Sequence, residues 1–291
     1  MASKKKRANL PALSQLQVEQ AVRAALLEDL GLAGDVTSDA TIPAAAKAVA
    51  HMSSREDGVV AGLSLAKEAF SQFDEKTKFK AYVKDGDRVT PGQKIAKIEG
   101  RARSVLGGER VALNYLCHLS GIATYTSRFA ERIAHTKAVV CCTRKTIPGL
   151  RAFEKYAVKC GGGSNHRYGL DDAILIKDNH IAVAGGVREA IEAARAFAGH
   201  LIKIEVEVDT LEQLKEALKA GPDVVMLDNM TPDQLKEGVD IVGGAIPIEA
   251  SGNVNIDTIK EIAEAGVDMI STSKITMSAP TLDIGLDIKI D

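Results

Sequence analysis

Residues 143–180 carry three short motifs that decide how this chain is interpreted. The first reads Thr-Arg-Lys-Thr-Ile-Pro-Gly-Leu-Arg from Thr143, the second Gly-Gly-Gly-Ser-Asn-His-Arg from Gly161, and the third Ile-Leu-Ile-Lys-Asp-Asn-His from Ile174. Each motif places cationic side chains beside turn-forming residues. A site for a multiply charged anion needs such a set, and the set comprises Arg144, Lys145, His166, Arg167 and Lys177.

The same pattern of a strand followed by a helix extends outward from this segment and fills the second half of the chain. Hydrophobic runs predict strands over residues 138–142, 173–176, 201–208, 224–227, 246–249 and 268–271. Helical periodicity with capping residues predicts helices after them, over residues 148–161, 187–198, 210–220 and 256–265, and a further helix that opens at Thr231. About six such units imply parallel strands with right-handed crossovers, either closed into a barrel or left as an open sheet.

Polar side chains with ligand-binding capacity follow nearly every one of these strands. In either architecture, ligands bind at the carboxyl ends of the strands. Chance would scatter such residues over both ends, so their position predicts a binding site. The residues concerned are Arg144, Lys145, Lys177, Glu207, Asp228, Ser251, Gly252, Asn253, Ser273 and Lys274.

The first half of the chain differs in character. It predicts an amphipathic helix over residues 16–30, ended by Gly31, and strands with turns over residues 78–100. Two helices are expected next, one capped by Ser104 and one starting at Gly121. We therefore expect a smaller α+β domain up to about residue 120, with these helices leading to the repeated units.

Composition excludes several classes of protein. The chain has 291 residues, of which 45% are hydrophobic and 26% charged, as in globular proteins of one large or two ordinary domains. The net charge of −2 disfavours nucleic acid as the main partner. No apolar run reaches the roughly 18 residues of a membrane span, and the N-terminus lacks the apolar region of a signal peptide. Residues 1–12, which contain the basic run at residues 3–7, are expected to form a solvated, disordered tail; an address signal or a nucleic-acid arm is the alternative interpretation of that run.

The four cysteines do not have the spacing of a zinc site or the density of a disulfide scaffold. We interpret them as reduced structural residues of a cytoplasmic protein, with a nucleophilic cysteine as the alternative. They are Cys117, Cys141, Cys142 and Cys160.

Beyond the three motifs, several other segments are similar to the quinolinate phosphoribosyltransferase family, in the order in which that family has them. The resemblance covers nearly the whole chain apart from the first dozen residues. The further segments are Gly-Glu-Arg-Val-Ala-Leu-Asn from Gly108, Ser-Gly-Ile-Ala from Ser120, Glu-Val-Glu from Glu205, Leu-Asp-Asn from Leu227, Glu-Ala-Ser-Gly from Glu249 and Ser-Ala-Pro-Thr-Leu-Asp from Ser278.

The resemblance implies a fold, an assembly and an activity. The fold would be an N-terminal α/β sandwich domain (residues 13–120) and an incomplete, about six-stranded α/β barrel (121–280). A strand in residues 281–291 would return to the first domain. The assembly would be a homodimer or larger, in which Arg110 reaches the partner's active site. The activity would be phosphoribosyl transfer from phosphoribosyl pyrophosphate to quinolinate with loss of CO₂, which gives nicotinate mononucleotide for NAD biosynthesis.

Within that resemblance, the chemistry of the two substrates suggests which residues would bind each of them. Guanidinium groups bind carboxylates in bidentate fashion, so Arg110, Arg144 and Arg167, with His166 and Lys177, are expected to hold quinolinate. Mg²⁺ binds through one or two carboxylates while keeping several waters, and Glu207 and Asp228 supply them. The remaining expected contacts with phosphoribosyl pyrophosphate and its leaving group come from Thr143, Lys145, Ser251, Gly252, Asn253, Ser273 and Lys274.

Some alternatives stay open from the sequence. Many relatives carry a glycine at the position of Ser273, whereas a serine there offers its backbone N–H and an added hydroxyl to the phosphate. Either Glu205 or Glu207 could simply pair with Lys203, and Asp172 and Asp178 suit turn or cap roles. His51, His118, His135 and His200 are expected to be structural.

Two rival functions remain. A paralogue found with molybdate transport genes shares the Thr-Arg-Lys and His-Arg elements, but the Leu-Asp-Asp at Leu170 and the Lys-Asp-Asn-His at Lys177 argue against it. Residues 83–95 resemble the hairpin of a biotinyl or lipoyl carrier, although no lysine stands at a recognisable hairpin tip.

Overall fold

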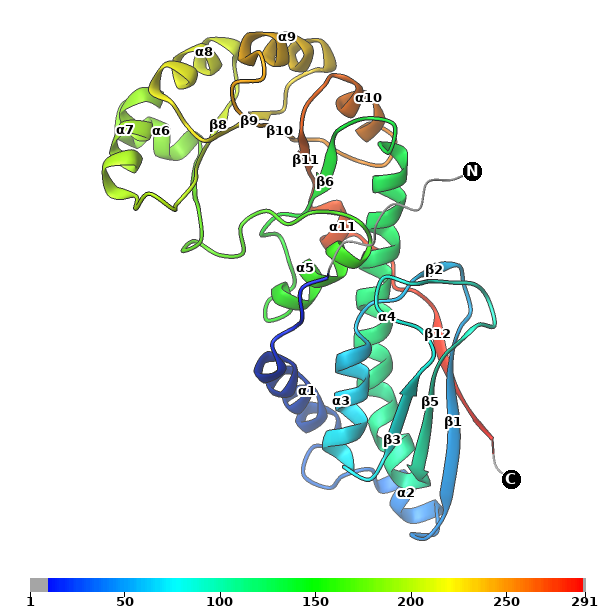
Figure 1. Ribbon diagram of the computed structural model, residues 1–291. Coiled ribbons are helices and arrows are strands. Elements are labelled where there is room, and N and C mark those ends of the chain that lie inside the picture. Colours follow the sequence, from blue (N-terminus) through cyan, green and yellow to red (C-terminus); the bar gives the residue numbers. More distant parts are fainter. Residues whose placement is uncertain (1–9, 290–291) are drawn as a thin grey trace. The chain divides into compact units, whose positions relative to one another are not determined.

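The computed structural model describes residues 10–289, which form two compact units (Figure 1). The first unit contains the chain up to Ser127, residues 148–162 and the chain from Ala279. The second contains residues 128–147 and 163–278. The basic residues 3–7, for which a disordered tail was expected, lie outside the described residues.

A four-stranded antiparallel sheet forms the first unit together with its helices. The strand order is β12-β1-β5-β3, with Val49 opposite Lys289 and Glu99. The strand expected near the C-terminus therefore pairs with β1 along most of its length. A two-stranded sheet joins β2 to β4. The strands are β1 (Lys47–Ser54), β2 (Gly58–Val59), β3 (Lys78–Ala81), β4 (Arg88–Val89), β5 (Lys94–Arg101) and β12 (Ile284–Lys289).

One helix stands where two were expected: α4 runs without a break over Ala102–Arg132. The expectation was wrong at Gly121, which permits close packing. A Cβ there would lie 2.1 Å from the backbone oxygen of Pro280. Ser104 is likewise inside the helix, where its hydroxyl donates to Asp74 at 2.9 Å. The other helices before α4 are α1 (Gln15–Leu30), α2 (Val36–Thr41) and α3 (Leu63–Phe73).

Helix α5 (Arg151–Cys160) groups with the first unit, although it was assigned to the barrel. Two contacts explain this. The Tyr156 hydroxyl donates to Asp85 at 2.8 Å, and His118 pairs with the fully buried Glu154 at 3.0 Å. These polar contacts tie α5 to the loop before β4 and to α4.

The second unit is built on a six-stranded parallel sheet in the order β6-β11-β10-β9-β8-β7. β6 and β7 follow each other in sequence but occupy opposite edges of the sheet. A closed barrel would pair them, so this is an incomplete α/β barrel, as expected. Its strands are β6 (Val139–Cys141), β7 (Ile174–Ile176), β8 (Ile204–Val208), β9 (Val224–Asp228), β10 (Ile248–Ser251) and β11 (Met269–Ser271).

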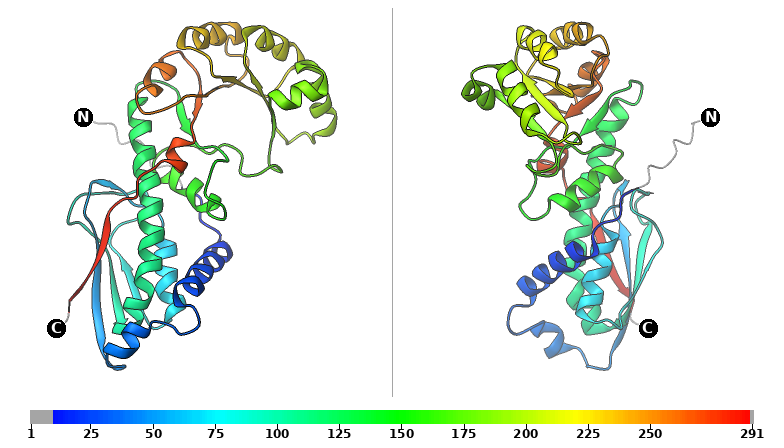
Figure 2. Two further views of the ribbon diagram at one scale, coloured as in Figure 1. Left: turned by 180° about the vertical axis from the view of Figure 1, so that it is seen from behind. Right: turned by 60° about the vertical axis from the view of Figure 1, so that its left-hand side comes forward.

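Helices follow the strands and curve along the sheet in two views (Figure 2). Capping residues start them where the sequence indicated: Thr210 accepts from Gln213 N–H, and Thr231 forms a capping box with Gln234. The helices are α6 (Asp178–Ala184), α7 (Val187–Phe197), α8 (Leu211–Ala220), α9 (Pro232–Val242), α10 (Ile259–Glu264) and α11 (Lys274–Met277).

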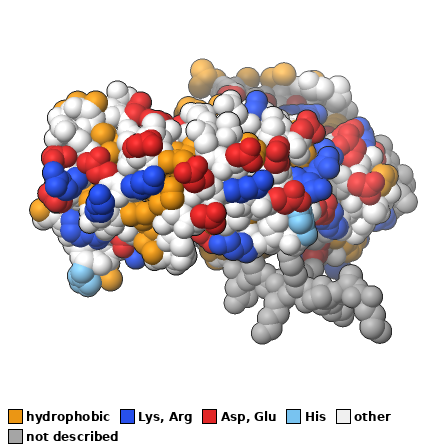
Figure 3. Space-filling view, turned by 90° about the horizontal axis from the view of Figure 1, so that it is seen from above, with side chains coloured by type: hydrophobic (Ala, Val, Ile, Leu, Met, Phe, Trp, Pro, Cys, Tyr) orange, Lys and Arg blue, Asp and Glu red, His pale blue; other side chains and the backbone are white. Residues whose placement is uncertain are grey.

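Within the described residues, no helix has the length and apolar character needed to cross a membrane. Lysine and arginine side chains are interspersed with aspartate and glutamate over the face that Figure 3 shows. No disulfide joins the four cysteines, all of which lie within residues 10–289.

Candidate active site

The site is built in two layers by the alternation of side chains along the parallel strands. At the carboxyl ends of β8, β9 and β10, the outer layer holds Glu207, Asp228 and Ser251. Two residues earlier on the same strands, and hence on the same face, stand the deeper residues Glu205, Met226 and Glu249.

The outer layer lines a cavity of about 510 Å³. Its walls are strongly polar and include two carboxylates and three lysines. Ten of the residues singled out in the sequence are among them: Thr143, Lys145, Lys177, Glu207, Asp228, Ser251, Gly252, Asn253, Ser273 and Lys274.

An adjoining cavity of about 350 Å³ reaches the deeper layer. It shares Thr143, Lys145, Lys177, Ser251 and Ser271 with the larger cavity. Besides the shared lysines, this smaller cavity is lined by two guanidinium groups and a histidine. Leu175 and Met226 give it apolar surface. The residues found only here are Arg144, His166, Arg167, Leu175, Met226 and Glu249.

Lys177 and Glu207 form an ion pair between the ends of β7 and β8. The alternative pairing of Glu205 or Glu207 with Lys203 is wrong, because the Lys203 ammonium lies 2.9 Å from Asp223 instead. Lys203 lies one residue before β8, at the amino end of the strand and away from the carboxyl end where Glu207 stands. Glu205 pairs with His166 and Glu207 pairs with Lys177, so neither glutamate pairs with Lys203.

Unusual backbone geometry fixes the rim of the larger cavity at Asn229, Gly252 and Asn253. Within residues 10–289, Asn229 and Asn253 are the two non-glycine residues with positive φ, both at 54°. Gly252 has φ +88°, and a Cβ there would lie 2.2 Å from Asn229 Oδ1. The Asn253 amide donates to Asn229 Oδ1 at 3.2 Å, and the Asn229 amide donates to Asp228 at 2.6 Å. Strained backbone of this kind clusters at functional sites.

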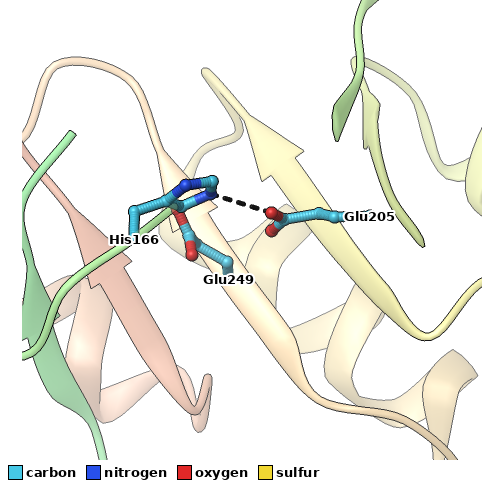
Figure 4. A group of neighbouring side chains, drawn as sticks. All are labelled: His166, Glu205 and Glu249. Carbon is cyan, nitrogen blue, oxygen red and sulfur yellow. Dashed lines mark hydrogen bonds and ion pairs between the residues drawn. The ribbon is translucent and has the colours of Figure 1, made fainter. Parts of the chain in front are cut away.

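His166 lies between two glutamates, Glu205 on β8 and Glu249 on β10 (Figure 4). Its Nε2 is 2.8 Å from Glu205 Oε2 and 3.9 Å from Glu249 Oε1. Its Nδ1 accepts the backbone N–H of Arg167 at 2.8 Å, so Nε2 carries the proton and donates to Glu205. The ring thus joins the glycine-rich loop to β8.

Three polar atoms around this histidine have no hydrogen-bond partner in the part of the chain that the structure describes. They are Arg167 Nε, Glu205 Oε1 and Glu249 Oε1, and all three are buried. Buried polar groups are normally satisfied, so such a concentration is typical of a functional site. Burial lowers the pKa of Arg167, with Arg144 as a further cause. Burial, and then the charge of Glu205, raises the pKa of Glu249 to about 7.

The other candidate residues are placed as follows. Arg110 belongs to the first unit, where it is exposed on α4. Asp172 accepts the backbone N–H groups of Tyr168 and Gly169, as a turn residue does. Helix α10 starts only at Ile259, three residues later than expected, so the loop at Ser251 does not lead directly into a helix.

Sequence reasoning did not select Glu249, Ser271 or Asn229 for the site. A signal for Glu249 was present, because it stands two residues before Ser251 and must share its face of the strand. Asn229 follows the last residue of a strand, a position where asparagine tolerates positive φ. Ser271 is the last residue of the strand expected over residues 268–271, so its position at a carboxyl end was itself a signal.

Known proteins match the chain over almost its full length. The N-terminal domain of quinolinate phosphoribosyl transferase matches residues 35–120, and its C-terminal domain matches residues 122–287. A probable nicotinate-nucleotide pyrophosphorylase [carboxylating] of Bacillus subtilis is 42% identical over 278 residues, which cover 96% of each chain. A nicotinate-nucleotide pyrophosphorylase [carboxylating] of Mycobacterium leprae is 42% identical over 92% of this chain and 95% of its own.

Solved structures agree with these sequence matches. NadC from Streptococcus pyogenes has a TM-score of 0.92 at 41% identity, covering 96% of this chain and all of its own. The nicotinate-nucleotide pyrophosphorylase of Francisella tularensis has a TM-score of 0.93 at 36% identity, covering 97% and 99%. Two domain matches that together span residues 35–287, joined to relatives of over 40% identity, establish that the chain belongs to the quinolinate phosphoribosyl transferase family.

Proposed function

We infer that this chain is a decarboxylating quinolinate phosphoribosyltransferase of NAD biosynthesis. It transfers the phosphoribosyl group of phosphoribosyl pyrophosphate to quinolinate and releases nicotinate mononucleotide, CO₂ and pyrophosphate. The observation that carries this inference is the pair of adjoining cavities, one lined by guanidinium groups and the other by carboxylates, lysines and strained backbone.

The smaller cavity fits quinolinate, a pyridine ring with two adjacent carboxylates. Arg144, Arg167 and Lys177 provide the positive charge, and Leu175 and Met226 provide apolar surface for the ring. Arg167 is already oriented, because its Nη1 donates to Ala173 O at 3.0 Å. Its unpartnered Nε leaves one N–H of the guanidinium for a carboxylate.

The larger cavity fits phosphoribosyl pyrophosphate. Its carboxylates, Glu207 and Asp228, would hold the Mg²⁺ that accompanies a pyrophosphate, since an all-oxygen donor set suits that ion. Bound Mg²⁺ would neutralise charge on the leaving pyrophosphate. Lys145 and Lys177 add to that neutralisation, and the backbone at Gly252 and Ser273 can approach the 5-phosphate closely.

The reaction follows from this arrangement without a covalent enzyme intermediate. The bond from the ribose to pyrophosphate breaks, and the pyridine nitrogen bonds to the oxocarbenium-like carbon that results. The ring then carries a positive charge, which stabilises the electron pair left on the ring carbon when the 2-carboxylate departs as CO₂. The residues contribute positioning and preorganised charge.

We also propose a homodimer in which Arg110 completes the partner's quinolinate site, and a cytoplasmic location. Support for the dimer is the exposed position of Arg110 on α4 and the family resemblance around it. Mixing Arg110→Ala protein with Lys177→Ala protein tests this directly. Hybrid dimers with one intact site should recover part of the activity, whereas no recovery would contradict a shared site.

The role of Asp228 is tested by substitution with asparagine. Asp228→Asn removes a carboxylate charge from the larger cavity, so more Mg²⁺ should be needed for half-maximal activity. An unchanged Mg²⁺ titration would remove Asp228 from the metal site.

Product analysis tests the function itself. Purified protein is incubated with phosphoribosyl pyrophosphate and Mg²⁺, and with either quinolinate or nicotinate. We expect nicotinate mononucleotide from quinolinate alone. Product from nicotinate alone, or from neither acid in folded protein, would contradict the inference.

A further inference from the structure

We propose that Glu249 is the proton donor that converts the decarboxylated ring carbon into the C–H of the product. The proposal rests on the function inferred above and names a residue for a step that the cations of the site cannot perform well. It starts from the cluster of Glu249, Glu205 and His166 (Figure 4). Glu249 and His166 of this cluster line the smaller cavity.

The chemistry requires an acid at this place. When the bond from ring C2 to the carboxyl carbon breaks, its electron pair stays on C2 and CO₂ leaves. That pair must take a proton to form the C2–H bond of the product. A group that gives this proton must face the same cavity as the ring and must hold the proton near neutral pH.

The smaller cavity offers few such groups. Among the described residues lining it, the charged ones other than Glu249 and His166 are Arg144, Lys145, Arg167 and Lys177. Arginine does not release its proton in proteins, and an ordinary lysine is a weak acid at neutral pH. His166 donates its one proton to Glu205 and accepts from Arg167 N–H, so both ring nitrogens are engaged.

Glu249 meets the requirement on position. It is 2% exposed on β10, two residues before Ser251, and it lines the cavity. Its Oε1 has no hydrogen-bond partner within residues 10–289, so that oxygen is available to a bound ligand. It also lies in the group of His166, Glu205 and Glu249 whose ligating atoms are all within 4.8 Å of one another.

The surroundings also keep a proton on Glu249. Burial and the neighbouring carboxylate of Glu205 raise its pKa to about 7, against the smaller opposing effects of His166, the Ser271 hydroxyl and Lys177. Two carboxylates this close and this poorly hydrated do not both ionise readily. The carboxylic acid form therefore persists below about pH 7 and is lost as pH rises. After the transfer, Glu249 is a carboxylate, and solvent returns its proton before the next turnover.

The test separates the two halves of the reaction in a single turnover. Pyrophosphate release reports ribosyl transfer, and nicotinate mononucleotide formation reports decarboxylation with protonation. In Glu249→Gln, which keeps the size and polarity but has no acidic proton, mononucleotide formation should slow by about 10²-fold, the usual contribution of a general acid. Pyrophosphate release and the KM for quinolinate should change little.

A matched control is Glu264→Gln, which removes an exposed carboxylate of the second unit that also pairs with a histidine, His135, at 2.9 Å. Both rates should stay as in the wild type. Equal slowing of both steps in folded Glu249→Gln would indicate a structural role and overturn the proposal. Wild-type mononucleotide formation in that variant would overturn it as well.

Two further measurements cover the case in which Glu249→Gln fails to fold. Glu249→Asp keeps an acidic proton but sets the carboxyl group back from the ring by one methylene. It should therefore slow mononucleotide formation selectively, but less than Glu249→Gln does. In the wild type, raising the pH above 7 should slow that step more than pyrophosphate release. Parallel slowing in both measurements would contradict the proposal. Wild-type protein that makes no mononucleotide at any pH would instead refute the function on which the proposal rests.

Discussion

Two buried carboxylates, Asp74 in the first unit and Glu249 in the second, lie in opposite surroundings. Asp74 is 8% exposed and accepts hydrogen bonds from Arg101 at 2.9 Å, from Ser104 at 2.9 Å and from the Lys76 backbone at 3.1 Å. The Arg101 hydrogen bond, followed by that of Ser104, lowers the pKa of Asp74. Glu249 has an unpartnered oxygen and a second carboxylate beside it, and its pKa is raised.

This difference in hydrogen bonding distinguishes buried groups with a structural role from buried groups that can react with a ligand. A buried charge whose hydrogen bonds are complete stabilises the fold, because no donor or acceptor is left without a partner. A buried group with incomplete hydrogen bonding costs stability, and it remains available to a ligand. Three of the five unpartnered buried side-chain atoms in residues 10–289 surround His166, which places the chemistry in the second unit.

The largest expected effect comes from Arg167→Ala. Losing hydrogen bonds from a charged group costs about 1.5–3 kcal/mol, so the KM for quinolinate should rise by roughly 10²-fold. The KM for phosphoribosyl pyrophosphate should change far less. Steady-state kinetics with each substrate varied in turn measures this. Arg195→Ala, which removes an exposed arginine paired with Asp223 at 3.1 Å, is the control. The reverse pattern of KM values would show that the two cavities have been assigned the wrong way round.

Asp74→Asn should destabilise the protein by roughly 2 kcal/mol, measured by chemical denaturation, because a charge-assisted hydrogen bond is replaced by a neutral one. The lowered pKa means that this stabilisation is present above the ordinary value of 3.8. It is lost as the pH falls from 3.8 toward the lower folded-state pKa. Wild type and variant should therefore converge in acid, and activity per folded molecule should not change. A stability difference that grows in acid would contradict the role of Asp74.

Gly252→Ala should have the smallest effect of the three, about a tenfold rise in the KM for phosphoribosyl pyrophosphate, or about 1.4 kcal/mol. Its added Cβ would meet Asn229 Oδ1 at 2.2 Å and displace the rim of the larger cavity. Gly92→Ala is matched in backbone strain, with φ +80°, but has nothing within 4 Å of its Cβ. Both variants should lose some stability, and only the first should lose substrate affinity. Equal kinetics in the two would mean that the rim does not contact substrate.

Much of the fold could be predicted from the sequence, because period-two strands and capped helices are local signals. All six strands of the parallel sheet were located, with β10 misplaced by two residues. The breaks that were wrong depended on contacts distant in sequence. Gly121 was expected to start a new helix. It lies inside α4 instead, where the missing side chain lets the backbone at Pro280 approach closely. Nothing near residues 148–161 indicated that α5 packs with the first unit.

The outer layer of the site was also within reach of sequence reasoning, because polar residues at strand ends converge at one edge of the sheet. Ten residues singled out from the sequence line one cavity. The deeper layer was not selected, since a buried glutamate within a strand looks the same in sequence whether it is satisfied or not. Only the structure distinguishes Glu205 and Glu249, which share His166, from Glu154, which pairs with His118 in the first unit.

The most direct test of the central claim, that the second unit holds a decarboxylating phosphoribosyl transfer site, is the release of labelled CO₂ from quinolinate labelled in its 2-carboxylate. The account predicts release only when phosphoribosyl pyrophosphate is present, in equal amounts with pyrophosphate and nicotinate mononucleotide. Release of CO₂ without phosphoribosyl pyrophosphate, or pyrophosphate formation without CO₂ in the wild-type protein, would contradict it.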